Sequence, residues 1–433
     1  MLIRNARIVT PSAVTRGAVL ITGTSITAVG SEISPPPAAT VVEANDLFLL
    51  PGLIDVHVHV RDPGAPEKED WLSATRAALA AGITTICDMP NNTLPTISPQ
   101  RLYEKREIAS HSALCDYALY LGATADNIGL AAQLASDIAG LKIYLASTTG
   151  PLLVDDWQTL FQHLRHTPSA IPITIHAEDE ECLRTFASVS SHDHNANRPP
   201  LCAELALYHV ITAARAAHRG VHIAHVSTPH EITILTKARA SGIPITCEIC
   251  PHHLYLTSDD AERLGGWGKV NPPLRSPSDV TALWRLLPYI DLFATDHAPH
   301  RPSEKAQPYP FAPSGFSGLE TLLPLLLLAV QEGRLRLTDI ATMAAFRPAQ
   351  IFHMHRKGLI APGYHADLCL VDITQQQCIQ PGTLHTKPND TPFRNWFLPG
   401  KVLNVWRRGE QVVSNGHITA TPGSGRPLRF HRP

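Results

Sequence analysis

The chain has 433 residues, of which 44% are apolar and 17% are charged, and its formal net charge is -2. This length allows one large domain with a well-buried core and a smaller second domain. The composition argues against a disordered chain and against a broad electrostatic partner such as nucleic acid. No segment has a signal-peptide core or the ~18 uninterrupted apolar residues of a membrane span, so we expect a soluble, cytoplasmic protein without nucleic-acid or membrane partners.

Short strands separated by turn residues are expected at both ends of the chain. They fall near residues 2–9, 18–21, 25–29 and 40–43 at the N-terminal end, and near 366–372, 401–406 and 411–414 at the C-terminal end. This spacing is typical of small β-domains. We therefore expect residues 1–51 and 358–433 to pair into one composite β-sandwich domain.

Between these ends, short apolar strands alternate with helices that are rich in alanine and leucine. The expected strands lie at 83–88, 140–144, 173–176, 222–225, 245–248 and 291–296, with a typical helix over 71–81 and a buried helix over 319–330. Such βα repetition over about 300 residues predicts an α/β fold, a (β/α)8 TIM barrel that covers residues 52–357. The C-terminal strand ends of such a barrel converge on one face, where the active site forms.

Two histidines one residue apart, His57 and His59, lie in the apolar run from Asp55 to Arg61. Alternate side chains of a strand share one face, so a strand here would place both imidazoles on it, ~7 Å apart along the backbone. That geometry suits one metal ion, and it also suits two hydrogen-bonded structural histidines. The pair by itself leaves both interpretations open.

Four further polar residues close apolar strands, and the barrel would bring them near the two histidines: Lys142, His176, His225 and Asp296. A histidine after a strand is commonly a polar cap, and Asp296 could be a helix N-cap. Lys142 is harder to explain, because a lysine in a barrel interior would be buried with its charge uncompensated. The coincidence of six such residues predicts a shared metal centre.

These residues resemble those of a known family. The His57-x-His59 pair, Lys142, His176, His225 and the segment from Ala294 to His300 are similar to the cyclic amidohydrolases, and to the dihydroorotases most closely. The resemblance extends over essentially the whole chain, to Gly400-Lys401-Val402. It implies two Zn²⁺ ions per chain that are bridged by a carboxylated Lys142. One ion would be bound by His57, His59 and Asp296, and the other by His176 and His225.

The substrate-side residues favour dihydroorotase over its sister enzymes. Arg61 follows His59 by two residues, so it leans from the same strand face, and a guanidinium can bind a carboxylate in bidentate fashion. Dihydroorotate carries such a carboxylate, and hydantoins need not. The resemblance adds Asn91 and His300 as further contacts to the carboxylate and Asn271 as a contact to the ring amide. Both asparagines adjoin prolines, where asparagine is also a common turn residue.

One motif departs from the family pattern. The run from Pro90 to Pro95 has a second asparagine, Asn92, where dihydroorotases have Pro-Asn-Thr, and this resembles allantoinase. An allantoinase or hydantoinase is therefore the alternative activity. A non-catalytic structural homologue is an alternative of another class, but it predicts missing metal ligands, and none of the six is missing.

The resemblance implies the reversible hydrolysis of L-dihydroorotate to N-carbamoyl-L-aspartate in pyrimidine (UMP) biosynthesis. A hydroxide that bridges the two zinc ions would be the nucleophile, because zinc lowers the pKa of water to ~7. Asp296 would accept its proton and deliver it to the departing nitrogen. The loops over 146–150 and 301–317 are the candidates for closing over the small-molecule substrate. The expected protein partners are a second copy of the chain, in a homodimer, and aspartate transcarbamoylase.

The eight cysteines are scattered, which predicts reduced thiols rather than a disulfide framework. Cys247 and Cys250, followed by His252 and His253, could form half of a zinc site or a redox dithiol. No second Cys or His pair completes a structural zinc site, so we expect two buried cysteines on a strand. The segment His192-Asp193-His194 is expected to be a solvated surface turn.

Overall fold

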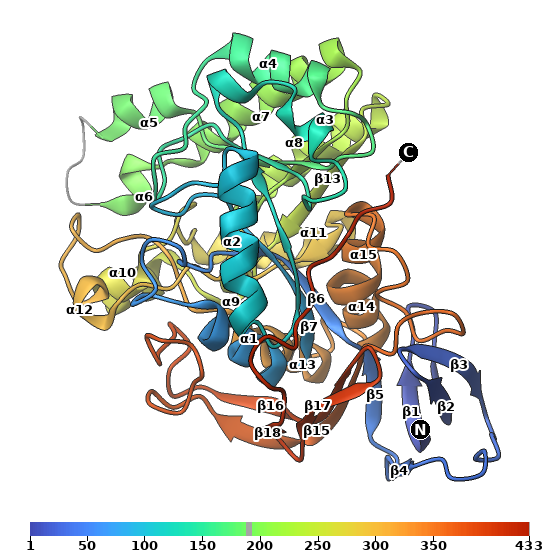
Figure 1. Ribbon diagram of the computed structural model, residues 1–433. Helices are drawn as coiled ribbons and strands as arrows, with labels where there is room; N and C mark the ends of the chain where they lie inside the picture. Colours follow the sequence, from blue (N-terminus) through green and yellow to red (C-terminus); the bar gives the residue numbers. More distant parts are fainter. Residues whose placement is uncertain (188–192, 433) are drawn as a thin grey trace.

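The computed structural model describes residues 1–187 and 193–432 (Figure 1). Their strands form one nine-stranded sheet and two sheets of parallel strands, which have six and three strands. Among the described helices, none is both long enough and apolar enough to cross a membrane. The fold is therefore of the α/β class, as the alternation of strands and helices predicted.

The nine-stranded sheet joins the two ends of the chain. β5 pairs with β1 in parallel and with β15 in antiparallel orientation, so it connects the N-terminal strands to the C-terminal ones. The strands are β1 (Leu2–Val9), β2 (Val14–Thr22), β3 (Ser25–Gly30), β4 (Val41–Glu43), β5 (Phe48–Pro51), β15 (Leu368–Cys378), β16 (Phe397–Arg407), β17 (Glu410–Ser414) and β18 (His417–Ile418). Their pairing gives a single sheet, so the finer prediction of a β-sandwich is not confirmed.

The parallel strands follow one another along the middle of the chain. They are β6 (Leu53–Val58), β7 (Ile83–Asp88) and β8 (Asp116–Leu119) in one sheet, and β9 (Leu121–Gly122), β10 (Leu141–Tyr144), β11 (Ile173–His176), β12 (Val221–Ile223), β13 (Ile245–Ile249) and β14 (Leu292–Phe293) in the other. Only Tyr120 separates β8 from β9. At the opposite ends of the two sheets, Val58 forms a bridge with His297, which lies just beyond β14. The first and last parallel strands thus come together.

Helices connect and surround these strands (Figure 1). They are α1 (Trp71–Ala80), α2 (Pro99–Ser112), α3 (Leu130–Gln133), α4 (Trp157–His166), α5 (Glu180–Ala187), α6 (His194–Asn197), α7 (Pro200–Ala217), α8 (Pro229–Ala240), α9 (Pro251–Tyr255), α10 (Ser258–Leu264), α11 (Pro277–Leu286), α12 (Pro302–Lys305), α13 (Leu322–Gln331), α14 (Leu337–Ala341) and α15 (Arg347–Ile351). The Asp70 side chain accepts a hydrogen bond from the Ser73 backbone, which fixes the start of α1. The helix expected over 71–81 is confirmed as α1, and the one expected over 319–330 is confirmed as α13, which follows a 3-10 turn at Leu319–Thr321.

Two strands end earlier than their sequences predicted. β12 ends two residues before His225, and β14 ends three residues before Asp296. Both residues have a positive φ, 31° for His225 and 47° for Asp296, and a strand cannot contain that conformation. Strained backbone of this kind is concentrated at functional sites. The chain therefore turns away from the sheet at the points where these two polar side chains are presented.

The C-terminal segment runs back across the parallel sheets rather than along the nine-stranded sheet. The Leu428 backbone N–H donates to the Tyr117 carbonyl, and that of Phe430 donates to the Ser136 carbonyl.

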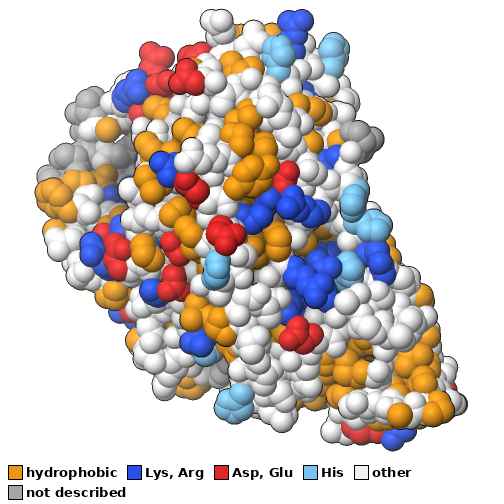
Figure 2. Space-filling view, in the orientation of Figure 1, with side chains coloured by type: hydrophobic (Ala, Val, Ile, Leu, Met, Phe, Trp, Pro, Cys, Tyr) orange, Lys and Arg blue, Asp and Glu red, His pale blue; other side chains and the backbone are white. Residues whose placement is uncertain are grey.

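Figure 2 shows one face of the molecule, on which basic side chains gather near the centre. Arg407, Arg408 and Arg426 lie together and line one surface cavity. Positive charge on this face is thus concentrated locally.

Candidate metal centre and active site

His57, His59 and Asp296 lie together at the ends of β6 and β14. Nε2 of His59 is 3.0 Å from Oδ1 of Asp296, and Nε2 of His57 is 3.3 Å from the same oxygen. One ligand atom from each residue lies within 4.8 Å of the others, and all three side chains are buried. The His59 backbone N–H donates to the His297 carbonyl at 2.7 Å, which joins the two strand ends. This group can bind one metal ion.

His176 and His225 form a second group beside the first. Nδ1 of His176 is 2.9 Å from Nε2 of His225, and the His225 ring centroid is 5.2 Å from that of His57. Burial lowers the pKa of His176, and it holds the pKa of His225 well below its usual value. Both rings are therefore neutral near pH 7, which is the form that binds metals. The structure brings together all five predicted histidine and aspartate ligands.

Lys142 differs from every other buried lysine in the described part of the chain. Lys105 donates to Met89 and Asn92, Lys357 donates to Asp116 and Asp367, and Lys305 donates to two backbone carbonyls. Nζ of Lys142 is equally buried but has no hydrogen-bond partner. Burial lowers the pKa of Lys142 to about 8. An unpaired buried amine is costly, which supports the view that Lys142 has a chemical role.

Buried carboxylates contact two of the predicted histidine ligands, His57 and His176, and hold their rings in place. Nδ1 of His57 contacts Glu248, and Nε2 of His176 lies 2.9 Å from Glu178. Arg198 in turn donates to both oxygens of Glu178, at 3.1 and 2.6 Å. Metal-binding histidines typically donate their second N–H to such a group, which fixes the tautomer. Burial alone would raise the pKa of Glu178, but Arg198 and His176 hold it well below its usual value.

Sequence reasoning did not identify these supporting carboxylates, although a signal exists for both. Glu178 follows His176 by two residues, and Glu248 is a charged residue inside the buried strand β13. A charged side chain in a buried strand was the observation that singled out Lys142, and it applies equally to Glu248.

A cavity that is open to solvent lies directly against the histidines, and its empty space, including the part open to solvent, is about 380 Å³. Its walls are formed by His57, His59, Arg61, Asn91, Tyr144, Thr148, Thr149, His176, His225, Asn271, Asp296, Ala298, Ser314 and Gly315. The loops predicted to close over substrate, 146–150 and 301–317, both contribute to this wall. Three of the four predicted substrate contacts line the cavity, and His300 does not.

Arg61 and His300 are neighbours, but only Arg61 reaches the cavity. The Arg61 side chain donates to the Pro299 carbonyl at 3.2 Å, and its terminal nitrogen is 3.3 Å from Nε2 of His300. His300 is 2% exposed, and its Nε2 donates to the Ser314 carbonyl at 3.0 Å. His300 is thus placed to hold the 301–317 loop, with its ring against Arg61.

The two predicted asparagines are engaged differently. Oδ1 of Asn91 is 2.7 Å from Nδ1 of His59, and its amide nitrogen donates to the Thr149 carbonyl at 2.7 Å. Asn91 therefore orients a predicted metal ligand and fixes the 146–150 loop. In contrast, Oδ1 of Asn271 is buried and has no partner among the described residues. Asn271 is free to accept a hydrogen bond from a ligand in the cavity.

Tyr144 is a cavity residue that sequence reasoning missed. Its hydroxyl group is buried without a partner in the described structure, and the Nζ atom of Lys142 is 5.0 Å from its ring centroid. Burial raises the pKa of Tyr144 well above its usual value, so the phenol stays protonated and can donate a hydrogen bond. Tyr144 follows Lys142 by two residues in β10, so the two side chains share one face. This spacing from Lys142 is the sequence signal that could have identified Tyr144 as a residue of the site.

The two cavity loops depend on glycines for close backbone contacts. Gly150 has φ of +98°, and a Cβ there would lie 2.6 Å from the Asn91 carbonyl oxygen. Gly315 has φ of +141°, and a Cβ there would lie 2.2 Å from the Ala298 carbonyl oxygen. Side chains at either position would push the loop out of its place. The shape of the cavity wall therefore depends on the backbone conformation of these two loops.

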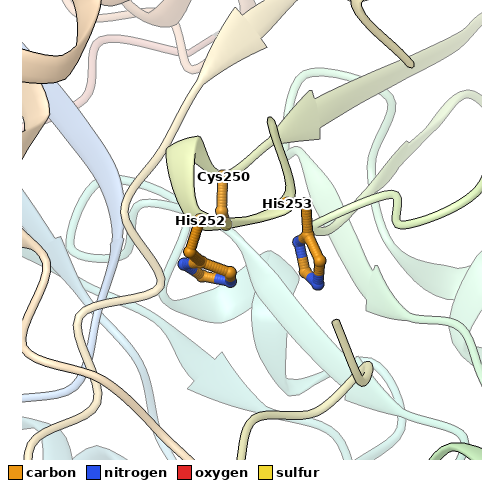
Figure 3. A group of neighbouring side chains, drawn as sticks. All are labelled: Cys250, His252 and His253. Carbon is orange, nitrogen blue, oxygen red and sulfur yellow. The ribbon is translucent and has the colours of Figure 1, made fainter. Parts of the chain in front are cut away.

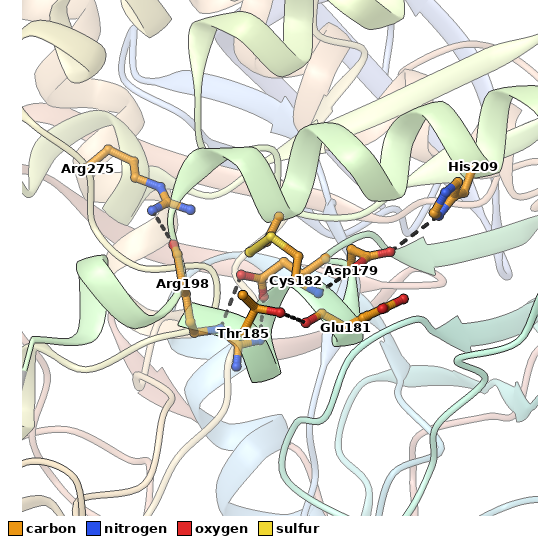
Figure 4. The surroundings of a disulfide bond; sticks show 9 residues. Asp179, Glu181, Cys182, Thr185, Arg198, His209 and Arg275 are labelled. Carbon is orange, nitrogen blue, oxygen red and sulfur yellow. Dashed lines mark hydrogen bonds and ion pairs between the residues drawn. A yellow bond between two sulfur atoms is a disulfide. The ribbon is translucent and has the colours of Figure 1, made fainter. Parts of the chain in front are cut away.

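One prediction about the cysteines is wrong. Cys182 in α5 and Cys202 in α7 form a disulfide, with their Cα atoms 5.4 Å apart (Figure 4). Packing of the two helices brings the thiols together, which no sequence spacing indicated. The Asp179 backbone N–H donates to the Cys202 carbonyl at 2.9 Å, and both cysteines pack against Ala146 at the start of a cavity loop. The disulfide thus lies behind the His176 side of the site.

A thiol titration tests this disulfide. Denatured protein that has not been reduced is expected to react at six thiols per chain, and reduced protein at eight, because six cysteines are free and two are paired. Ellman's reagent in guanidinium gives the count. The variant Cys202→Ser is the control, since it should give the same count with and without reduction. Eight thiols before reduction would show that the bond does not form.

Two smaller predictions are corrected in part. Cys247 lies on β13 as expected, but Cys250 lies just beyond that strand, at the start of α9, and both are buried. In the 192–194 segment, His192 lies outside the described residues. His194 is half-buried rather than solvated, with Nε2 at 2.9 Å from the Val270 carbonyl, and burial lowers its pKa to about 3.

Comparison with known proteins places this geometry in a family. The amidohydrolase family model matches residues 48–412. Dihydroorotase from Halobacterium salinarum is 37% identical over 410 residues, which cover 93% of this chain and 94% of that protein. Multifunctional protein CAD from Squalus acanthias is 39% identical over 399 residues, and there the match covers 91% of this chain but only 16% of the relative.

The fold is shared with a solved hydantoinase. L-Hydantoinase (dihydropyrimidinase) from Arthrobacter aurescens superimposes with a TM-score of 0.93 at 26% sequence identity, and the match covers 99% of each chain. This structure and the solved hydantoinase therefore share one α/β architecture. The chain belongs to the amidohydrolase family, and the resemblance to dihydroorotases that its ligand motifs predicted is confirmed.

Proposed function

We propose that this protein is a dihydroorotase, which interconverts L-dihydroorotate and N-carbamoyl-L-aspartate. The observation that carries the proposal is the position of Arg61 in the wall of the cavity that holds His57, His59 and Asp296. A buried guanidinium needs an anionic partner, and a carboxylate matches its geometry. The substrate carboxylate would be held there while the ring amide faces the metal ligands.

The residues of the site fit two zinc ions. Imidazole nitrogens and carboxylate oxygens are common zinc ligands, and the two groups of His57 with His59 and of His176 with His225 lie side by side. We assign Asp296 to the first group, and a carboxylated Lys142 to both. When bound, zinc would lower the pKa of a water molecule toward neutrality and polarise the ring carbonyl.

Lys142 is suited to carboxylation by its own surroundings. Carbamate formation requires the neutral amine, which bonds to the carbon of CO₂ and loses a proton. A pKa lowered to about 8 by burial leaves an appreciable neutral fraction at physiological pH. The product is an anion, and it would replace an uncompensated cation with a ligand for two cations.

Asp296 is suited to proton transfer. Burial alone would raise the pKa of its carboxyl, but His57 and His59 hold it well below its usual value, so the group is ionised and can act as a base. We infer that Asp296 accepts the proton of the attacking water and passes it to the ring nitrogen as the amide bond breaks. Asn271, with its free Oδ1, would accept a hydrogen bond from the ring N–H and so orient the ring.

We expect Arg61→Ala to raise the KM for dihydroorotate by about 10- to 100-fold, the usual weight of a lost charge-assisted hydrogen bond. An uncharged cyclic amide such as dihydrouracil has no carboxylate for Arg61 to bind, so its KM should change little. Steady-state kinetics with both substrates gives the comparison. A similar increase for both would mean that Arg61 shapes the cavity rather than binding the carboxylate.

Tyr144→Phe is expected to lower kcat by about 10²-fold with little change in KM. The phenol faces the cavity with an unused donor, and a donor that stabilises charge developing on the carbonyl oxygen acts mainly in the transition state. The matched control is Tyr117→Phe, which removes a hydroxyl that bonds the Arg106 carbonyl, away from the site. If both variants behave alike, Tyr144 has only a structural role.

A side-by-side assay of the zinc-loaded protein with dihydroorotate, allantoin and dihydrouracil tests the proposed activity. The second-place asparagine, Asn92, keeps allantoinase as the alternative. In the structure, however, the Asn92 amide donates to the Val60 carbonyl and its oxygen accepts from Lys105, so it points away from the cavity. The feature that suggested allantoinase is thus a buried structural contact. Turnover of allantoin but not of dihydroorotate would reverse this assignment.

We further propose a closed (β/α)8 barrel over residues 52–357 and a composite domain of 1–51 and 358–433. The bridge between Val58 and His297 and the shared sheet of the chain ends support this division. A homodimer and an association with aspartate transcarbamoylase remain proposals. Light scattering of the purified protein, alone and with aspartate transcarbamoylase, tests both.

A further inference from the structure

The turn that follows β13 carries a second group of buried metal-binding side chains. Cys250, His252 and His253 all come from the first turn of α9, and both rings extend to the same side of it (Figure 3). One ligand atom from each residue lies within 4.8 Å of the others. The side chains are at most 3% exposed. None of the three lines the cavity beside His57 and His59, so the proposed reaction leaves them without a role.

Two ring nitrogens of this group lack partners. Nε2 of His252 and Nδ1 of His253 are buried, and neither has a hydrogen-bond partner in the described structure. Buried polar atoms almost always have a partner in folded proteins, and exceptions point to an ion or a water molecule. Both unpartnered atoms belong to residues of the same group, together with a thiol. The coincidence favours a single occupant that satisfies all of them.

The hydrogen bond of His253 fixes which of its nitrogens is available. Nε2 lies 3.1 Å from the Pro272 carbonyl oxygen, which can only accept, so Nε2 carries the hydrogen. Burial lowers the pKa of His253 to about 4, so the ring is neutral and Nδ1 presents a lone pair. A histidine that donates one N–H to a backbone carbonyl while its other nitrogen faces a metal is a recurrent arrangement.

We propose that Cys250, His252 and His253 bind a zinc ion at a site of their own, apart from the proposed catalytic ions. A thiolate and two imidazoles suit zinc, which bonds to sulfur at about 2.3 Å and to nitrogen at about 2.0 Å. Ligand atoms around such an ion lie about 3.3 to 3.8 Å apart, so small rotations of the side chains would bring the three ligand atoms to these separations. Zinc is four-coordinate in such sites, and a water molecule would supply the fourth ligand.

Binding of the ion also accounts for the charge of the site. Burial, followed by the charges of Asp296 and Glu248, raises the pKa of the Cys250 thiol well above its usual value. Zinc would replace the thiol proton, which leaves to solvent as the zinc–sulfur bond forms. The cation then compensates both the thiolate and the nearby carboxylates.

The ion would fix a segment that reaches the active site. His253 bonds the carbonyl of Pro272, and the preceding residue, Asn271, lines the cavity with its free Oδ1. A metal bound to His253 would therefore hold this segment in place. His252 packs edge-on against Phe316, next to Gly315, which is another residue of the cavity wall. The expected role of the site is structural, to hold these two parts of the wall.

Cobalt reports the sulfur ligand directly. The purified full-length protein is stripped of metal and reconstituted with Co²⁺ alone, and its near-ultraviolet spectrum is recorded. A thiolate bound to Co²⁺ gives an intense charge-transfer absorption, which nitrogen and oxygen ligands lack. We expect this band in the wild type and its loss in Cys250→Ser, together with one metal ion fewer per chain. The catalytic ligands proposed above contain no sulfur, so the result is independent of the proposed function.

Matched controls make the outcome decisive. Cys247→Ser removes a buried thiol from β13, the strand just before Cys250, where Cys247 contacts Arg239, and this variant should keep the band. Cys378→Ser removes a half-buried thiol elsewhere and should also keep it. His252→Gln should weaken the band while leaving Cys250 in place. A wild-type spectrum without the band, or a band that survives Cys250→Ser, would overturn the proposal, and the wild-type spectrum needs no variant to fold.

Discussion

Asp296→Asn is expected to lower kcat for dihydroorotate hydrolysis by about 10²- to 10⁴-fold, the range for loss of a general acid–base. The amide retains an oxygen at the position that lies 3.0 Å from His59 and 3.3 Å from His57. Metal binding should therefore persist, because an oxygen ligand is still present. An amide cannot take up a proton from water, so the proton-transfer steps should be lost in both directions of the reaction.

Measurement of turnover together with zinc per chain separates these two roles of Asp296. The control is Asp291→Asn, just ahead of the same strand, where the carboxylate pairs with Arg239. This change should reduce stability and leave kcat largely intact. An Asp296→Asn enzyme that turns over at the wild-type rate with its metal bound would remove the general-base assignment. A variant without bound metal would instead show that the carboxylate is needed first as a ligand.

The proposed ligand set could be predicted from the sequence because each member lies in an apolar strand or just after one. His57, Lys142 and His176 lie within strands that are otherwise buried and apolar, so each is a local exception to a clear pattern. Parallel strands that follow one another place their ends on one side of the sheet. Local pattern and general topology were therefore sufficient, without knowledge of the side-chain contacts.

Features that depend on contacts between distant elements could not be predicted in this way. The disulfide requires α5 and α7 to bring Cys182 and Cys202 together, and their sequence separation of 20 carries no such signal. The position of His300 behind Arg61 depends on the path of the 301–317 loop. The early ends of β12 and β14 depend on positive φ values at His225 and Asp296, which propensity disfavours.

For Tyr144 and Asn91, the sequence is enough to place the residue near the site, but only the structure shows which groups the side chain contacts. The spacing in β10 places Tyr144 on the face of Lys142, but only the structure reveals that its hydroxyl is unpartnered. Asn91 was expected on the substrate carboxylate, and the structure adds its contact with Nδ1 of His59. Substitution of Asn91 should thus affect metal binding as well as KM.

A comparison of two buried lysines, Lys142 and Lys105, tests the proposed role of Lys142. Lys142→Ala is expected to lower activity by at least about 10³-fold and to reduce zinc per chain, because the anion that would bridge the two groups of histidines is lost. Lys105 is buried to the same extent, but its amine is hydrogen-bonded to Met89 and Asn92 and paired with Asp88. Lys105→Met should instead cost about 3–5 kcal/mol of stability, since it leaves Asp88 unpaired.

Lys142→Ala should therefore lose activity but not stability, whereas Lys105→Met should lose stability. Lys142→Ala removes an amine that has no hydrogen-bond partner in the described structure, so its fold should be at least as stable as the wild type without metal. Thermal unfolding of both metal-free variants, with zinc analysis after reconstitution, measures the contrast. Carbon-13 NMR of protein exchanged with labelled bicarbonate should show a carbamate signal in the wild type and in Lys105→Met but not in Lys142→Ala. If Lys142→Ala bound two zinc ions and kept its activity, the amine would be only a buried structural group, and its missing acceptor would need another explanation.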